Sequence, residues 1–196
     1  FELRESYRKI LKKNKIKLME NESLLEINGD LAITGTGEIQ FDTLLMSVGT
    51  KPNLKGLEKL NLETYQFGVV TDEELRTNVK NVFAIGDING KINLAHVASA
   101  EGIVAVEIIA GKSKIMDYSK VPTGIYGFPE IASVGLTEQE LKGDYKITKF
   151  PLAANGRSLS EGDSEGYIKV ITDKEYGELI GVHILASNAT ELVSEA

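Results

Sequence analysis

The sequence predicts an α/β fold joined to an α+β part with an antiparallel sheet. Two observations support this prediction. The segment from Val82 to Gly111 passes from a short apolar run, through a glycine-containing loop, into the residue spacing of a helix. Beyond Pro122 the chain consists of short segments of strand character separated by turn residues. A strand followed by a helix, and then several strands in succession, are typical of layered folds that mix the two element types.

The chain is expected to begin with a helix over residues 1–14. Apolar side chains recur there at the spacing of one helix face, and Lys12 and Lys13 suit the negative end of the helix dipole. The apolar face consists of Leu3, Tyr7, Ile10 and Leu11. No capping residue precedes this helix, so we expect the chain to begin inside a larger domain.

A β-meander is expected after the helix. Residues 16–19 alternate between apolar and polar side chains, as strand residues do. Residues 24–27 and 31–34 flank Asn28 and Gly29, which tolerate the positive φ angles of a tight hairpin turn. These segments predict a small antiparallel sheet.

A buried apolar strand is also predicted over residues 41–48. Gly35 and Gly37 before it indicate another hairpin turn, because the third glycine and the strand-to-helix junction of a phosphate-binding loop are missing. The strand is expected to end at Gly49, and Pro52 continues an exit loop.

The middle of the chain carries the clearest ligand-binding pattern. Residues 82–85 form an apolar run too short for a helix, which predicts a buried strand that Gly86 and Asp87 close. A glycine at that point admits the close approach of a ligand, and the carboxylate beside it accepts hydroxyl hydrogen bonds. We expect Asn93 to cap the following helix and Gly111 to end it. The apolar face of this helix contains Val97, Ala100, Val104 and Ile108.

A domain boundary is expected at Val121 and Pro122, where a short polar segment gives way to strand-rich sequence. A short helix is expected over residues 137–141, because Thr137 and Glu140 have the spacing of a capping box. Strand character is found at residues 123–126, 131–134, 146–150, 167–171 and 179–184. These elements fit an antiparallel sheet with helices on one side.

The composition limits the classes of function. With 196 residues, of which 42% are hydrophobic and 26% charged, the chain resembles an ordinary globular protein. Its net charge of -7 and its lack of a basic patch argue against nucleic-acid binding. The apolar runs are far shorter than a bilayer span, so a cytoplasmic protein is expected. The chain contains no cysteine, which excludes disulfides, thiolate metal sites and a redox dithiol within these residues.

The sequence AIGDINGKINLAHVASAEG resembles the second FAD-binding motif of the flavin-dependent disulfide oxidoreductases. Its Leu-Ala-His segment resembles the dihydrolipoamide dehydrogenase branch, because the glutathione reductase branch usually has Thr-Pro where this chain has Ala95 and His96. The resemblance implies that Asp87 binds the ribityl chain of FAD, and that the start of the helix lies against the flavin ring through its backbone. The cofactor-binding residues implied here are Gly86, Asp87, Asn93, Leu94, Ala95 and His96.

The sequence LLMSVGTKPN resembles the end of the NAD domain in the same family. The resemblance implies that four residues contact NAD through their backbone. These are Ser47, Val48, Gly49 and Thr50. The alternative is a simple exit loop after a strand.

The segments VPTGIYGFPEIASVGLTEQEL and GELIGVHILASNATELVSEA resemble the interface, or dimerisation, domain of this family. The resemblance therefore covers the whole chain and implies three parts. Residues 1–50 would be the carboxyl-terminal part of the NAD-binding domain, residues 51–120 the second segment of the FAD-binding domain, and residues 121–196 a truncated dimerisation domain. The implied folds are partial Rossmann-like domains and an α+β interface domain.

The family passes electrons from a dithiol, through an active-site disulfide and FAD, to NAD. The resemblance implies a homodimeric flavoprotein of cell redox homeostasis that oxidises dihydrolipoyl groups, with FAD and NAD as cofactors. The partners it suggests are lipoyl domains of 2-oxo acid dehydrogenase or glycine cleavage complexes. Alternatives are a glutathione or mercuric reductase-like enzyme of the same family, or a non-catalytic dimerisation or nucleotide-binding module.

No catalytic residue is assigned within this chain. The family's cysteine pair and its carboxyl-terminal histidine and glutamate have no counterpart in these 196 residues, so the chain alone is expected to be inactive. His96 is expected to serve through its backbone, and His183, in a β-branched segment, is expected to be structural. Their separation along the chain does not support a metal site. Arg157 is expected to form a surface ion pair.

Overall fold

The computed structural model describes residues 2–196, which form two compact units. The first unit contains the chain up to Val48 together with Thr123–Ser133 and Thr137–Ala196. The second contains Gly49–Pro122 and the short segment Val134–Leu136. No helix within residues 2–196 has the length and apolar character that a bilayer crossing requires.

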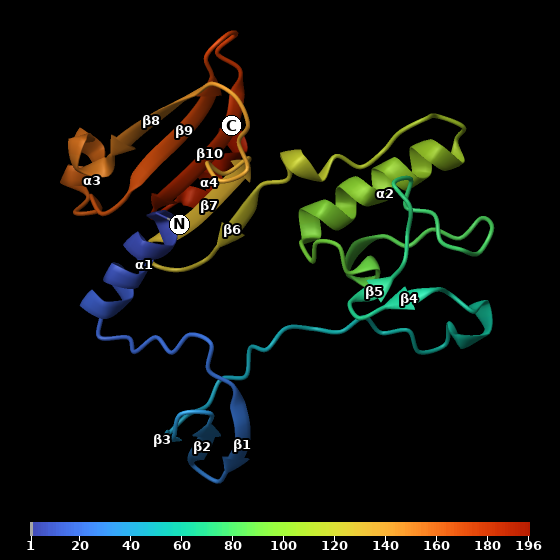
Figure 1. Ribbon diagram of the computed structural model, residues 1–196, viewed down its shortest axis with the longest axis horizontal. Helices are drawn as coiled ribbons and strands as arrows, with labels where there is room; N and C mark the ends of the chain where they lie inside the picture. Colours follow the sequence, from blue (N-terminus) through green and yellow to red (C-terminus); the bar gives the residue numbers. More distant parts are fainter. Residues whose placement is uncertain (1) are drawn as a thin grey trace. The chain divides into compact units, whose positions relative to one another are not determined.

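A five-stranded sheet forms the core of the first unit (Figure 1). Its strands are β6 (Thr123–Ile125), β7 (Glu130–Gly135), β8 (Tyr145–Pro151), β9 (Tyr167–Asp173) and β10 (Leu179–Ala186). They lie in the order β6-β7-β10-β9-β8, and the pairs β6/β7, β9/β10 and β8/β9 are antiparallel. The predicted antiparallel sheet and its five strand segments are confirmed.

Burial along the strands follows their place in the sheet. In β9 the buried residues Tyr167, Lys169 and Ile171 alternate with half-buried ones, which is the period of a strand with one covered face. In β10, which lies between β7 and β9, residues 181–186 are all buried. The central strand is therefore buried on both faces over these residues, whereas the neighbouring strand is buried on one face.

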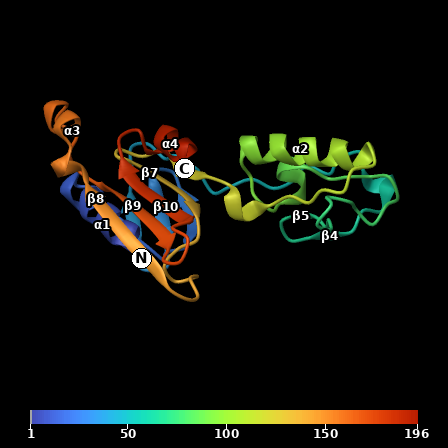
Figure 2. The same ribbon diagram turned by 90° about the horizontal axis from the view of Figure 1, so that it is seen from above.

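Short helices lie next to the sheet (Figures 1 and 2). They are η4 (Leu152–Ala154), α3 (Gly156–Ser160), α4 (Ala189–Leu192) and η5 (Val193–Glu195). α4 contacts β6 and β10. The backbone N–H and the hydroxyl of Thr190 both donate to Oε2 of Glu130, at 3.0 and 2.6 Å, so the first turn of α4 is joined to β7. Arg157 in α3 forms the expected surface ion pair, with Glu161 at 2.8 Å.

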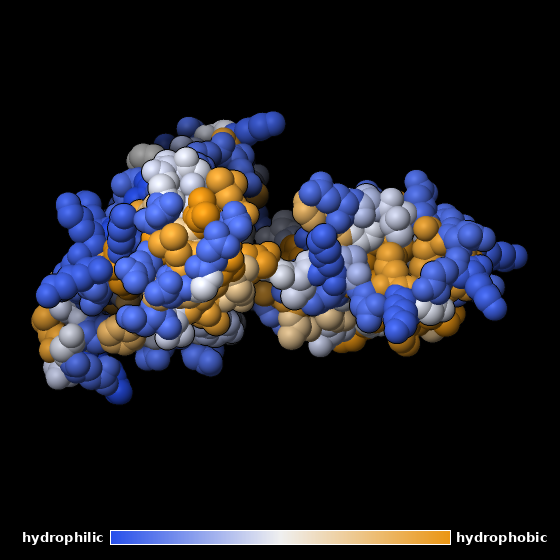
Figure 3. Space-filling model, turned by 90° about the horizontal axis from the view of Figure 1, so that it is seen from below, coloured by the Kyte–Doolittle hydropathy of each residue, from blue (hydrophilic) through white to orange (hydrophobic). Residues whose placement is uncertain are grey.

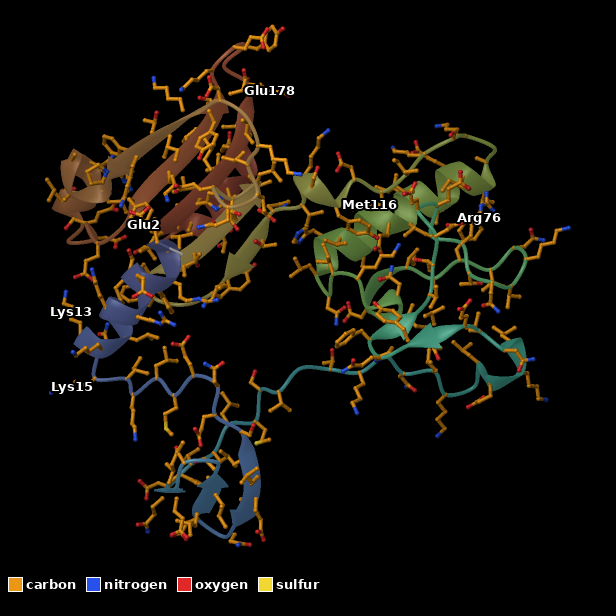
Figure 4. The ribbon with its side chains drawn as sticks, in the orientation of Figure 1. Glu2, Lys13, Lys15, Arg76, Met116 and Glu178 are labelled. Atoms are coloured by element: carbon orange, nitrogen blue, oxygen red, sulfur yellow. The ribbon has the colours of Figure 1, made fainter. Side chains whose placement is uncertain are left out.

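Helix α1 (Glu2–Lys13) lies beside the same sheet (Figures 1 and 2). Glu2 in its first turn contacts Nζ of Lys169 at 2.5 Å and also forms an ion pair with Lys149 (Figure 4). Glu138 contacts the same lysine Nζ at 2.5 Å. The side chain of Lys169 is only 8% exposed, so a buried ammonium group with two carboxylate partners joins α1 to β9. The helix prediction is confirmed for residues 2–13, and Phe1 lies outside the described residues.

The predicted β-meander is present as a separate three-stranded antiparallel sheet. Its strands are β1 (Leu24–Asn28), β2 (Leu31–Thr34) and β3 (Glu38–Gln40). Gly29 has a φ of 60°, a left-handed value that suits glycine in a tight turn. The backbone N–H of Thr34 donates to the carbonyl of Gly37 at 2.8 Å and closes the second turn. Both predicted hairpin turns are confirmed.

The second unit is built around one long helix, α2 (Ala95–Ile109). Its other elements are η1 (Glu58–Leu60), β4 (Thr64–Tyr65), β5 (Gly68–Val69), η2 (Gly86–Asn89) and η3 (Tyr118–Lys120). The core consists of Leu75, Val104, Ala105 and Ile108, against which Phe83 and Met116 pack. The Arg76 guanidinium lies 4.9 Å from the ring centroid of Phe83 and covers one side of this core (Figure 4).

Three predicted strands and one predicted helix are wrong. Residues 16–19 and 41–48 have no regular secondary structure, and residues 82–85 form only one isolated bridge, between Arg76 and Phe83. A strand needs neighbours for its backbone hydrogen bonds, and residues 2–196 supply no further strand to these segments. Residues 137–141 form a single turn, in which the Glu140 carboxylate accepts from the N–H and hydroxyl of Thr137 at 2.9 and 2.6 Å.

Apolar side chains reach the surface of both units (Figure 3). In residues 41–48, predicted as a buried apolar strand, Leu45 is 87% and Val48 is 82% exposed. Contiguous exposed apolar residues usually mark a surface that another part of a protein covers.

Removal of both carboxylates that face Lys169 is expected to destabilise the first unit strongly. The double substitution Glu2→Gln, Glu138→Gln leaves the buried ammonium group without an anionic partner, which typically costs about 3–5 kcal/mol. Glu2→Gln alone is expected to cost about 1 kcal/mol or less, because Glu138 remains. Urea unfolding followed by circular dichroism measures both, with the exposed pair Glu26→Gln, Glu38→Gln as the control. Equal midpoints for the two double variants would contradict the prediction.

The same cluster predicts a dependence of stability on pH. Hydrogen bonds from Lys149 and Lys169 lower the pKa of Glu2 below its ordinary 4.5, so its stabilisation is present above that pH and is lost as the pH falls through the lowered value. Burial opposes the charge on Lys169, but hydrogen bonds with Glu138 and Glu2 outweigh burial and raise its pKa above 10.5. Its stabilisation is therefore present below pH 10.5 and is lost as the pH rises through the raised value.

Candidate functional site

A tight turn at η2 presents the predicted site residues. Ile85 is extended, with φ -128° and ψ 153°, and the chain then reverses through Gly86 at φ 70° and Gly90 at φ 64°. The N–H of Gly90 donates to the carbonyl of Asp87 at 3.2 Å. A Cβ at Gly90 would lie 2.2 Å from the carbonyl oxygen of Phe67, so only glycine fits there. The turn is therefore fixed both by its dihedral angles and by close backbone packing.

Asp87 lies at the second position of this turn and is exposed. Within residues 2–196 its carboxylate has no hydrogen-bond or ion-pair partner. The neighbouring Gly86 packs closely on α2, since a Cβ there would lie 3.1 Å from Cβ of Ala98. The structure thus holds a carboxylate at the surface on a rigid turn, with its acceptor positions available to a ligand.

The amino-terminal end of α2 lies next to this turn, with which it is in contact. The prediction that Asn93 caps the helix is wrong, because the N-cap residue is Leu94, at φ -131° and ψ 135°, and its side chain forms no cap hydrogen bond. The helix starts at Ala95, one residue later than the predicted cap requires. Its first N–H groups therefore remain available, and the helix dipole makes this end favourable for electron-rich groups.

The side chain of His96 is held away from these N–H groups. Its Nε2 lies 2.9 Å from the carbonyl oxygen of Pro122, the residue at which the second unit ends. The imidazole is exposed, and the contact joins the first turn of α2 to the chain that leaves the unit. A structural side chain with an available backbone agrees with the role expected for His96.

The four residues of the second predicted site are exposed and have no regular secondary structure; they are Ser47, Val48, Gly49 and Thr50. Gly49 has a φ of 85°, a conformation that favours glycine. The boundary between the two units falls between Val48 and Gly49. The structure therefore brings together six of the ten predicted site residues, around η2 and α2, while the backbone role of the other four stays a prediction.

Sequence reasoning missed a buried polar cluster directly behind the turn. Glu101, on α2, is 0% exposed, and Asn89, at the end of η2, is 1% exposed. The Glu101 carboxylate accepts from the N–H of Gly86 at 2.5 Å, from Nδ2 of Asn89 at 3.0 Å and from the hydroxyl of Tyr118 at 2.5 Å. The signal was present in the sequence, because Glu101 is four residues after Val97 and three before Val104, on the face that was predicted to be buried.

The opposite side of α2 is also apolar. Ile103, Val106 and Ile109 are 61%, 64% and 67% exposed, and they line a groove of about 620 Å³ together with Phe83 and Ile85. A helix with apolar side chains on two opposite faces is typical of one that packs between other elements. Residues 2–196 bring together no group of three or more histidine, cysteine or acidic side chains suited to a metal ion.

Two family models match the chain. The model described as pyridine nucleotide-disulphide oxidoreductase matches residues 2–102, and that family's dimerisation-domain model matches residues 121–196. Dihydrolipoyl dehydrogenase 2, mitochondrial, from Arabidopsis thaliana is 38% identical over 211 residues, which cover 100% of this chain and 42% of that protein. Dihydrolipoyl dehydrogenase from Bacillus subtilis is 44% identical over 163 residues, which cover 80% of this chain and 35% of that protein. The chain therefore spans less than half the length of these relatives.

Solved structures show the same fold. LpdA from Mycobacterium tuberculosis has a TM-score of 0.85 at 24% identity, over 96% of this chain and 44% of that protein. The flavoprotein disulfide reductase RclA from Escherichia coli has a TM-score of 0.84 at 22% identity, over 97% of this chain and 47% of that protein. The predicted combination of an α/β part and an α+β part with an antiparallel sheet is confirmed by these similarities.

Proposed function

Because the chain belongs to the pyridine nucleotide-disulphide oxidoreductase family, we propose that it forms part of a dihydrolipoyl dehydrogenase that uses FAD and NAD. The proposed reaction oxidises a dihydrolipoyl group to a lipoyl group and reduces NAD. Relatives 38% and 44% identical to this chain carry the name dihydrolipoyl dehydrogenase, which supports this substrate over others of the family.

The observation that carries the proposal is the geometry of the Gly86–Asn89 turn beside the start of α2. This geometry fits FAD because it combines an exposed carboxylate without a protein partner, glycines at both ends of that carboxylate's turn, and a helix end without a side-chain cap. We assign Asp87 to the hydroxyl groups of the ribityl chain, since a carboxylate accepts two or more such hydrogen bonds. FAD, when bound, carries two electrons between a dithiol and a nicotinamide.

The start of α2 is assigned to the ring end of the flavin. The residues involved are Asn93, Leu94, Ala95 and His96. Their backbone groups and the positive end of the helix dipole favour an electron-rich edge. His96 contributes only through its backbone in this proposal, because its imidazole is engaged with Pro122. No proton is assigned to its side chain.

The dinucleotide of NAD is assigned to the backbone of Ser47–Thr50. These residues are exposed and lie outside helices and strands, and the positive φ of Gly49 turns the chain without a side chain that would hinder a ligand. The chain contains no cysteine, so the dithiol chemistry of the proposed reaction requires residues that are not among these 196. We therefore propose that the chain binds and orients the cofactors while the thiol exchange occurs elsewhere in the enzyme.

An activity assay tests the proposed substrate. The natural protein that contains this chain is expected to reduce NAD with dihydrolipoamide as the electron donor. Its kcat/KM is expected to be at least about tenfold lower for glutathione disulfide with NADPH, and for mercuric ion with NADPH. The isolated 196-residue chain is expected to show no turnover. A preference for either of the other substrates would reassign the enzyme within the family, and normal turnover by the isolated chain would refute the assignment of the thiol chemistry.

The assignment of Asp87 is tested by flavin retention. Asp87→Asn in the natural protein is expected to raise the dissociation constant of FAD by about tenfold or more, because hydrogen bonds to a charged acceptor are lost. Glu73→Gln, which removes the same charge from an exposed position of the same unit, is the matched control. The flavin absorbance per protein after gel filtration measures both. Equal retention by the two variants would exclude Asp87 as a flavin ligand.

We further propose that residues 121–196 form a homodimer interface. The match to a dimerisation domain supports this, and so does a cluster of exposed apolar residues at the end of β6 and directly after it. Ile125 is 58%, Tyr126 84% and Phe128 82% exposed. Aromatic residues are enriched in the buried centre of protein interfaces. A lipoyl domain remains the proposed second partner, on the ground of the proposed substrate alone.

The dimer proposal predicts that substitution of Tyr126 weakens the dimer. Tyr126→Ser is expected to weaken dimerisation by about tenfold or more, because truncation of a central aromatic residue typically costs over 1 kcal/mol. Tyr176→Ser is the matched control, since Tyr176 is 82% exposed on the turn between β9 and β10. Sedimentation equilibrium of the natural protein measures the dissociation constant. Dimers of equal strength in both variants would place the interface elsewhere.

A further inference from the structure

Glu101 is a buried acid whose carboxylate joins three elements of the second unit. The residue is 0% exposed, and no lysine, arginine or histidine of residues 2–196 forms an ion pair with it. Burial of an ionised carboxylate without a counter-charge is costly, and only good hydrogen bonds offset it. An apolar side chain at this position would have continued the buried face of α2 without that cost. The acid therefore has a role that an apolar residue cannot fill.

The hydrogen bonds of Glu101 lie at the two ends of the η2 turn. Its Oε2 accepts from the N–H of Gly86, the first residue of the turn, at 2.5 Å. Both carboxylate oxygens accept from Nδ2 of Asn89, the last residue of the turn, at 3.0 Å. The two residues between these ends, Asp87 and Ile88, are thereby held in one position relative to α2.

Neighbouring groups orient this carboxylate. The hydroxyl of Tyr118, in η3, donates to Oε1 at 2.5 Å. Nδ2 of Asn89 also donates to the carbonyl of Ala84 at 3.3 Å, and its Oδ1 accepts from the N–H of Lys91 at 2.9 Å. The hydroxyl of Tyr65 donates to the carbonyl of Asn89 at 3.1 Å. Every polar atom of the Asn89 side chain and both oxygens of Glu101 are thus hydrogen-bonded.

We propose that Glu101 is a positioning residue that sets the affinity for FAD, by holding the Gly86–Asn89 turn so that Asp87 presents its carboxylate to the cofactor. The proposal rests on the proposed function, because it takes Asp87 as a flavin ligand. Glu101 touches no ligand itself and acts only through the turn. A binding group that is held in place before the ligand arrives loses less entropy on binding, which is the physical reason why the support raises affinity.

The hydrogen-bond acceptors that remain after substitution predict which variant of Glu101 still holds the turn. Glu101→Gln keeps one carbonyl oxygen, which can accept from Gly86 and Asn89, and its amide can donate to the hydroxyl oxygen of Tyr118. Glu101→Ala leaves the N–H of Gly86 and the amide of Asn89 buried without acceptors. The phenol of Tyr118 stays protonated over the ordinary pH range, because burial and the hydrogen bond to Glu101 raise its pKa, so it remains a donor.

Titration of the deflavinated natural protein with FAD tests the proposal. Glu101→Ala is expected to raise the dissociation constant of FAD by about tenfold or more, Glu101→Gln by less than about threefold, and Tyr118→Phe by an intermediate factor. Glu107→Gln is the matched control, since this acid is on the same helix and pairs with Lys112 and Lys114 instead. Hydrogen exchange of the peptide that contains the η2 turn is expected to be faster in Glu101→Ala than in Glu107→Gln, before any flavin is added.

The outcomes separate this proposal from a purely structural role. If Glu101→Ala lowers the melting temperature but binds FAD within threefold of the unsubstituted protein, Glu101 only stabilises the fold and the positioning role is refuted. If Glu101→Ala does not fold, the FAD affinities of the other variants decide between the two roles. Equal FAD affinities of Glu101→Gln, Tyr118→Phe and the control refute the proposal. If the unsubstituted protein binds no FAD, the proposed function itself fails, and this inference fails with it. The proposed function and this inference are both supported if the unsubstituted protein binds FAD, Glu101→Ala loses that binding, and Glu101→Gln keeps most of it.

Discussion

The hydrogen bonds of one buried carboxylate organise the second unit. Glu101 belongs to the helix, accepts from the turn before the helix and from a tyrosine after it, and so connects three segments of the chain. The apolar core formed around Leu75 and Ile108 lies toward the carboxyl-terminal half of α2, whereas the turn lies at its amino-terminal end. Burial of apolar surface alone is not directional, and close packing at Gly86 and Gly90 shapes the turn without pairing its polar groups. Hydrogen bonds of fixed geometry pair those groups.

Local patterns predicted the elements that local interactions form. The five strands of the large sheet, α1 and the two hairpin turns were predicted, because each depends on residue alternation, helical spacing or a glycine at a tight turn. The apolar runs over residues 41–48 and 82–85 have equally strong patterns but form no strand. Apolar character shows that a segment favours burial, while a strand also needs a neighbouring backbone. Single-sequence patterns contain no information on whether that neighbour lies within the same 196 residues.

The residues of the candidate site were likewise predicted in part and missed in part. Gly86 and Asp87 were predicted from a glycine and an acid after an apolar run, and they do lie together at the start of a helix. Asn93 was expected to be the cap because its side chain suits that position, but the backbone of Leu94 takes it. Glu101 was missed because the buried face of the helix was identified from apolar residues alone. An acid at the spacing of the buried face is itself a signal, since a buried charge is retained only where it forms specific hydrogen bonds.

The contact between His96 and Pro122 brings the two ends of the segment 96–122 together. The imidazole nitrogen and the proline carbonyl oxygen are 2.9 Å apart although the two residues are 26 positions apart, and the remainder of α2 and all of η3 lie between them. The connection from Gly111 to Met116 within this loop lies beyond the helix and is largely exposed. Its length can change at a small entropic cost without moving either end, because the ends are joined elsewhere. Insertions and deletions in this connection are therefore expected to leave the start of α2 in place.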